Sequence, residues 1–476
     1  MKTLKYKNIA FILILFCLSL NGYSQNSADS LYNYLEIAAK NNSDVLQKFA
    51  EYQAALQKVP QVGSLPDPEF SMGIFLSPME LLAGKQVADM RLMQMFPWFG
   101  LIKNAKDEMS LMAQAKYESF RNAKLKVFFD IQSVWFELFK INQNIRISEK
   151  NIEILSTIER LAVIKFKAVA TEKGVNRSMS TASNQNFASN STGMNSMGGN
   201  VVSNSGPTKS SSAIISDNSM GSSSGNSGLS DIYRIQIEIG DLQNNIELMK
   251  NQRITIVAKF NSFLNRPPRA NVNIPDSIIS DDFLLSATIS DSIMKKNPML
   301  TMLLLEQQSI EARKKMIAKM GFPMVGLGIN YSLINKSEMS TSTMNGKDMI
   351  MPMITATLPI YRKKYKAMTE EADFLKLANI QNYQSISNSL QIEYYQAMEL
   401  YQDAKRRIIL YENQYLLASK TLNIMLKSFS SSAASLTDIL RVHQQTLNYE
   451  YKQVEATSDY NISVAWLKRL MASSQI

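Results

Sequence analysis

The chain repeats itself, and this internal repeat constrains its fold more than any other feature of the sequence. The matching segments are 97–165 with 359–427 and, after a jump in register, 229–235 with 436–442. The jump means that the first half carries an insertion of about 55 residues between Lys165 and Leu229. We therefore expect two copies of one structural unit, a first repeat at 25–270 and a second repeat at 271–476.

Each repeat contains a long stretch that favours helix. No proline occurs between Trp98 and the insertion, or between Ile360 and the C-terminus. A strict four-three spacing in the second repeat predicts a coiled-coil seam. The seam positions are Leu390, Tyr394, Ala397, Tyr401, Ala404, Ile408, Tyr411, Tyr415, Ala418, Leu422 and Met425. We expect long antiparallel helical hairpins at 98–264 and 360–473, which are hard to reconcile with an ordinary soluble helical bundle.

Two short segments of each repeat alternate between apolar residues and small or polar ones. They predict strands at about 69–76, 86–96, 324–334 and 349–358. One apolar and one polar face is typical of membrane strands that contact lipid on one side and a lumen on the other. A strand packed on a soluble core is the alternative. Four strands cannot close a barrel, which needs about eight, whereas three copies of the chain would supply about twelve.

The N-terminus has the pattern of a secretory signal peptide over residues 1–24. Lys2, Lys5 and Lys7 precede an apolar run from Ile9 to Leu20, which is shorter than the roughly 20 residues that a membrane-spanning helix needs. No other run of about 18 apolar residues occurs, so insertion into a membrane would have to use β-strands. For an exported chain we expect no nucleic-acid partner, although the formal net charge is +10.

The composition excludes most kinds of catalytic and metal site that proteins use. One Cys and one His among 476 residues cannot build a disulfide framework, a Cys/His zinc site or the usual nucleophile–base sets. We expect no enzymatic activity and no cofactor. Residues 171–228, within the insertion, are mostly Ser, Asn, Gly and Thr, a composition that predicts a low-complexity flexible segment at the first hairpin tip.

These features together resemble the TolC-type outer-membrane efflux proteins over essentially the whole mature chain. The resemblance lies in the signal peptide, the duplication, the two strands per repeat, and the prolines that follow the second strand of each repeat, Pro97 and Pro359. It extends to the Asn-rich turns near Asn42 and Asn297 and to the segment 260–267. The order and spacing of these features carry the resemblance, since no single one is specific.

The resemblance implies a mainly α fold with a small β part. It implies a homotrimer, with a twelve-stranded barrel in outer-membrane lipid that continues as a long helical coiled-coil barrel through the periplasm. The implied partners are a periplasmic adaptor (a membrane fusion protein) and an inner-membrane resistance-nodulation-division pump. The chain would pass substrates to the outside without reacting with them.

The resemblance also assigns roles to particular residues. The hairpin tips would form the periplasmic aperture and the adaptor contact, through Asp231, Arg234, Asp438 and Arg441. Well-known members have an aspartate where Arg441 stands, so we expect a ring of mixed charge. Pro97 and Pro359 would act as swivels between strand and helix. From the local sequence, Ser230 and Thr437 are expected to cap the following helices, and Asp231 and Asp438 to lie in their first turns.

The 28 methionines bear on the cargo. Those in expected strands or loops are candidate soft-metal contacts: Met90, Met93, Met95, Met339, Met344, Met349, Met351 and Met353. Thioethers suit Cu(I) and Ag(I), and efflux channels for these ions resemble this sequence. The alternative is that Met fills irregular gaps in cores and interfaces. The lone His443 is expected to be an ordinary solvated or interface residue.

Other functions remain open at this point. An exit duct for organic compounds or for type I protein secretion would share the whole fold. A periplasmic coiled-coil scaffold would share the heptads but not the four alternating strands.

Overall fold

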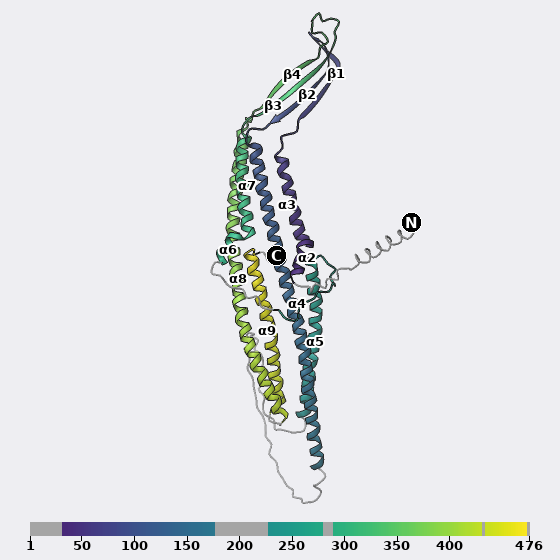
Figure 1. The fold of residues 1–476 in the computed structure, drawn as a ribbon, viewed down its shortest axis with the longest axis vertical. Coiled ribbons are helices and arrows are strands. Elements are labelled where there is room, and N and C mark those ends of the chain that lie inside the picture. Colours follow the sequence, from purple (N-terminus) through teal and green to yellow (C-terminus); the bar gives the residue numbers. More distant parts are fainter. Residues whose placement is uncertain (1–30, 177–226, 279–288, 431–433, 474–476) are drawn as a thin grey trace, which may run out of the picture. The chain divides into compact units, whose positions relative to one another are not determined.

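The computed structural model describes residues 31–176, 227–278, 289–430 and 434–473. The fold is mainly helical with one small antiparallel sheet (Figure 1). The first half contains α2 (Leu31–Asn41), α3 (Ser43–Val62), β1 (Glu69–Leu81), β2 (Gly84–Phe96), α4 (Leu101–Asn176) and α5 (Ser227–Phe263). The second contains α6 (Ile289–Lys296), α7 (Pro298–Met320), β3 (Met324–Asn335), β4 (Met349–Thr357), α8 (Arg362–Ser430) and α9 (Leu436–Leu470). The same order of elements thus occurs twice.

The chain forms two compact units. One unit contains the sheet, the short helices and parts of the four long helices, from residues Met1–Asn144, Lys250–Tyr411 and Lys452–Ile476. The other contains the remaining parts of the long helices, Ile145–Met249 and Glu412–Tyr451. Within the described ranges, no helix combines the length and the apolar character that crossing a lipid bilayer requires.

The predicted signal peptide at 1–24 lies outside the described residues, as does most of the predicted insertion. The ends of that insertion differ from the expectation. Helix α4 continues to Asn176, and α5 already begins at Ser227. Composition placed the boundary at Thr171, but Glu172 and Lys173 are good helix formers and extend the preceding helix.

Strand β1 is longer than the expected 69–76. Its pairing with β2 shifts register after Ile74 and resumes where Met79 faces Gln86. Pro78 lies in this irregular stretch, where its missing amide hydrogen does not interrupt the ladder. The alternation of the sequence fades at the irregularity, so a pattern of period two could not follow the strand to Leu81.

The coiled-coil seam predicted on α8 is buried or half-buried at every position, while many of its neighbours on the helix are exposed. In the unit that contains the sheet, Tyr401 of this seam packs against Tyr460 of α9, with ring centroids 5.2 Å apart. A second core in the same unit centres on Tyr34 and Phe260, whose rings meet edge to face at 5.0 Å. Aromatic and aliphatic packing between helices therefore holds this unit together.

Two buried asparagines hold equivalent helix ends in the two halves. The Asn42 side chain accepts hydrogen bonds from the backbone amides of Asp44 and Val45 at the start of α3 and donates to the Phe263 carbonyl at the end of α5. The Asn297 side chain accepts from the Met299 amide of α7 and donates to the Leu470 carbonyl at the end of α9. Each asparagine thus satisfies free groups at two helix ends with one amide.

Candidate functional site

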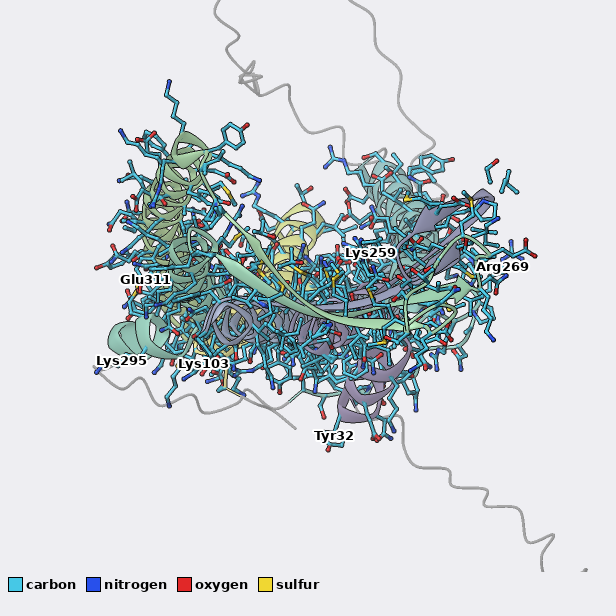
Figure 2. All side chains as sticks on the ribbon, turned by 90° about the horizontal axis from the view of Figure 1, so that it is seen from above. Tyr32, Lys103, Lys259, Arg269, Lys295 and Glu311 are labelled. Atoms are coloured by element: carbon cyan, nitrogen blue, oxygen red, sulfur yellow. The ribbon has the colours of Figure 1, made fainter. Side chains whose placement is uncertain are left out.

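The four strands lie in the order β1-β2-β3-β4, all antiparallel, so the two central strands come from different halves of the chain. Seen from above, the strands run side by side in a gentle curve (Figure 2). Because every neighbouring pair is antiparallel, all four connections to helices lie at one end of the strands, and both hairpin turns lie at the other end. Paired residues point to the same face, so the register defines the two faces of the sheet.

One face of the sheet is apolar and uncovered. We define the apolar face by Phe70, Met72, Ile74, Ala88, Met90, Leu92, Phe96, Val325, Leu327, Ile329, Tyr331, Leu333, Ile350, Pro352, Ile354 and Ala356. Gln94, a polar amide that pairs with Leu327, also lies on this face. Its large aliphatic side chains are exposed, with Ile354 at 79% and Ile350 at 67%. A soluble monomer rarely exposes an apolar surface of this extent.

The opposite face is polar but rich in methionine. We define the polar face by Glu69, Ser71, Gly73, Asp89, Arg91, Met93, Met95, Met324, Gly326, Gly328, Asn330, Ser332, Met349, Met351, Met353, Thr355 and Thr357. The alternation of β3 in the sequence already shows its glycines and polar residues on one side, as expected.

The eight candidate methionines fall into three places. Met93, Met95, Met349, Met351 and Met353 lie on the polar face, whereas Met90 lies on the apolar face opposite Met72. Met339 and Met344 are in the loop between β3 and β4, with 84% and 58% of their surfaces exposed. The structure therefore brings together five of the eight.

Sequence reasoning missed Met324, which lies on the polar face opposite Thr357. It also missed the glycines between the methionine-bearing strands, Gly326 and Gly328. The Gly-x-Gly spacing was visible in the sequence, and so were the four strands, but the sequence did not show which strands would pair on either side of it.

Pro97 and Pro359 occupy equivalent positions. Pro97 directly follows β2 and precedes the long helix α4. Pro359 comes two residues after the end of β4 and precedes the long helix α8. Beside Pro97, the Trp98 ring stacks on Phe322 with centroids 5.2 Å apart, and Gly100 has a φ of +84°, a conformation that favours glycine. The proposed swivel at these prolines stays a prediction.

In the second unit, α5 and α9 bring the predicted tip residues close together. Arg234 donates a hydrogen bond from Nη1 to the Thr437 hydroxyl at 3.0 Å, and Arg441 pairs with Asp438 at 3.7 Å. Both arginines line a surface groove of about 350 Å³ between the two helices. Gln444 closes one side of it by donating to Glu238 at 2.7 Å. Sequence reasoning did not identify Glu238 and Gln444, which lie one turn beyond the predicted residues.

The expected helix caps at the tips are wrong. Helix α9 begins at Leu436, so Thr437 is inside its first turn, and its hydroxyl accepts from Arg234. Helix α5 begins at Ser227, which puts Ser230 and Asp231 beyond the cap. Asp438 does lie in the first turn of α9. The error arose because matching the two repeats aligned the residues but did not locate the first helical turn.

Asp231 is not part of the groove. Its side chain is half-buried, and this burial raises the pKa of the carboxyl above its usual value, although Arg234 and Lys165 partly offset the rise. Of the four predicted tip residues, Arg234 and Arg441 line the groove, Asp438 pairs with Arg441, and Asp231 does not line the groove. Their predicted role at an aperture stays a prediction.

His443, expected to be solvated or at an interface, is not solvated. Only 1% of its surface is exposed, and neither ring nitrogen has a hydrogen-bond partner among the described residues. Burial lowers the pKa of the imidazole to about 4. His443 is therefore a neutral residue of the helical core near physiological pH.

Across the part of the chain that the structure describes, no three His, Cys, Asp or Glu side chains gather in a way that could hold a metal ion. Any metal contact there would use other ligands, and the thioethers of the polar face are the soft ones.

No protein-family model matches the sequence, and no curated protein sequence is significantly similar to it. Solved structures do match. The outer-membrane channel OprN aligns over 93% of this chain and 90% of its own, with a TM-score of 0.67 and 11% identity. The outer membrane protein VceC from Vibrio cholerae aligns over 93% and 96%, with a TM-score of 0.65 and 12% identity.

CusC, solved in a study of transmembrane channel formation, aligns over 93% of this chain and 91% of its own, with a TM-score of 0.66 and 12% identity. These structures share the fold along nearly the whole chain. The chain therefore has the fold of the outer-membrane channels, and its resemblance to TolC-type outer-membrane efflux proteins, indicated by the sequence, is confirmed at the level of the fold.

Proposed function

We propose that this protein is the outer-membrane channel of an efflux system, exported to the outer membrane with a large periplasmic portion. The uncovered apolar face of the sheet is the observation that carries the proposal. Lipid would cover this face, while the polar face would line a water-filled lumen. The shared fold of the solved channels supports the same conclusion. The chain would be a conduit rather than an enzyme.

The proposal requires several copies of the chain. Four strands are too few to close a barrel, and three copies would make one of about twelve strands. Exposed apolar residues on the long helices α8 and α5 support such an assembly. On α8, exposed apolar residues recur at intervals of seven, a spacing typical of a second coiled-coil seam: Ile409 with Leu416, and Leu410 with Leu417 and Ile424. On α5, Tyr233, Leu248 and Ile254 are exposed.

The groove between α5 and α9 supports a protein contact at the tips. Its two arginines and Glu238 offer charged groups beside the exposed Ile237, a mixture suited to a protein surface. We infer that a periplasmic adaptor binds here and links the channel to an inner-membrane pump of the resistance-nodulation-division class. An Arg234→Glu variant that crosslinks to the adaptor as efficiently as the native chain would contradict this assignment.

For the cargo we propose Cu(I) and Ag(I), because methionines concentrate on the face that would line the lumen. Efflux of organic compounds and type I protein secretion use the same architecture and are the competing candidates. A strain that lacks the gene tests the choice. We expect lost copper and silver tolerance, restored by the gene on a plasmid. Normal metal tolerance with lost dye or detergent tolerance would overturn the metal assignment.

Membrane fractionation tests the channel itself. The full-length protein should float with outer-membrane lipid on a density gradient and should resist extraction by high salt. Recovery in the soluble periplasmic fraction would contradict the proposed function and favour a periplasmic scaffold.

A further inference from the structure

The register of the sheet assembles methionines from two strands around a strip of bare backbone. Met93 of β2 pairs with Gly328 of β3, and Gly328 pairs in turn with Met353 of β4. The next row on the same face pairs Met95 with Gly326. Because glycine has no side chain, the thioethers on either side can extend over β3 from both neighbours.

The packing around Gly326 shows that two of these side chains do so. A Cβ atom added to Gly326 would lie 2.5 Å from the Met95 Sδ atom and 3.6 Å from the Met93 Sδ atom. Both sulfurs therefore lie over the same glycine. At Gly328 an added Cβ atom would lie only 2.8 Å from the Leu92 carbonyl oxygen, so the backbone of β2 leaves no room for a side chain there.

The third methionine, Met353, lies on β4, on the other side of β3 from Met93 and Met95. Neighbouring strands are about 4.8 Å apart, so β2 and β4 lie about 10 Å from each other across β3. Extended methionine side chains from both strands can bridge that distance over Gly328. Met93, Met95 and Met353 are all half-buried, so a bound ion would be shielded from water on one side and accessible on the other.

Gap filling does not explain why this whole face is rich in methionine. Methionine fills gaps where a packed core is irregular, but Met349 and Met351 on the same face are each 47% exposed. The face is otherwise made of glycine and polar side chains, and Glu69 pairs with Met93 on its far side. A neutral thioether set beside a carboxylate suits a soft monovalent cation.

We propose that Met93, Met95 and Met353 form a thioether site for Cu(I) or Ag(I) on the polar face of the sheet. This inference deepens the proposed function, because it rests on the polar face lining the channel lumen. The site would give a soft cation a place to bind on its way out, and passage through the channel requires that this binding be weak enough for release.

The chain contains a matched control. Met72 and Met90 pair with each other on the apolar face, on the other side of the same sheet. Replacing them with leucine removes two thioethers from the protein without touching the proposed site. Leucine and methionine differ little in volume, so both sets of variants should fold.

The experiment uses the purified full chain in detergent and titrates Ag(I), or Cu(I) held reduced against a chromophoric chelator. The Met93→Leu/Met95→Leu/Met353→Leu variant should bind at least about tenfold more weakly than the native chain. The Met72→Leu/Met90→Leu variant should bind as the native chain does. Equal binding by the triple variant and the native chain, or equal loss in both variants, would overturn the site.

A Gly326→Ala variant gives a second test. The new methyl group would occupy the space that the Met95 sulfur now fills, so affinity should fall although every thioether is still present. Unchanged affinity in this variant would contradict the geometry.

Binding and function can fail separately. Native protein that floats with the outer membrane and restores metal tolerance, but binds no Ag(I) when purified, would overturn the site and leave the channel in place. Purified protein that binds Ag(I) through these three residues, but never reaches the outer membrane, would support the site and overturn the channel.

Discussion

At the scale of single residues, two asparagines do the same structural work in the two halves. Asn42 and Asn297 are each about 95% buried and each joins the first turn of one helix to the last carbonyl of another. Helices have backbone amides and carbonyls without partners at their ends. The Asn42 side chain forms hydrogen bonds with three such groups, and the Asn297 side chain with two.

We predict that Asn297→Ala lowers the free energy of unfolding by about 1–2 kcal/mol, because it leaves a helix amide and a buried carbonyl without partners. Denaturant unfolding followed by circular dichroism measures the change. Asn382→Ala, on the exposed surface of α8, is the control and should leave the midpoint unchanged. Equal midpoints for Asn297→Ala and the native chain would refute the capping role.

His443 gives the second prediction at this scale. Above about pH 6.5 the imidazole is neutral in both the folded and the unfolded chain. As the pH falls from 6.5 toward 4, the imidazole takes up a proton in the unfolded chain but not in the folded one. The free energy of unfolding therefore falls by about 3 kcal/mol over this range. Below pH 4 this loss levels off.

Because His443 is the only histidine, a His443→Leu variant isolates its contribution. Thermal melts of the native chain and the variant at pH 7 and pH 5 should diverge at the lower pH, with the variant the more stable. Parallel pH curves would show that the imidazole is hydrated or paired in solution.

At the scale of elements, most of the strands and the long helices could be predicted from periodicity and from the absence of proline. A spacing of two identified the faces of β3, and a four-three spacing identified the buried seam of α8. Both follow from local geometry, in which side-chain direction depends only on position along the element.

The pairing of strands could not be predicted in this way. Met93 and Met353 flank Gly328 because β3 lies between β2, from the other half of the chain, and β4. Nothing in either segment alone specifies that register. The tip caps failed for a related reason, since the first turn of α9 depends on where its backbone hydrogen bonds begin at Ser435.

A lysine on the apolar face of β3 and a lysine on its polar face should have opposite effects on insertion into the outer membrane. Ile329→Lys puts an ammonium group on the apolar face and should cost about 2–4 kcal/mol at the centre of a bilayer, which would deplete the protein from the outer membrane. Ser332→Lys puts the same group on the polar face opposite Asp89 and should insert normally. Quantitative blots of the outer-membrane fraction compare them. Equal levels of both variants would contradict the assignment of the faces.

At the scale of the whole molecule, the exposed apolar residues need an explanation that a single chain does not offer. The sheet exposes most of its apolar face, and α8 exposes a second heptad stripe beside the seam that its own chain buries. Under the proposed function, lipid would cover the first surface and a neighbouring copy of the chain would cover the second.

The stripe on α8 therefore predicts the oligomeric state. The native chain should be a trimer in detergent, and Leu417→Lys/Ile424→Lys should shift it toward monomer, because two ammonium groups would enter an apolar seam in each interface. Sedimentation corrected for bound detergent measures the mass. Gln402→Lys adds a charge at an exposed polar position of the same helix and should leave the trimer intact. A trimer that withstands the double substitution would place the interface elsewhere, and a native monomer would remove the basis for a closed barrel altogether.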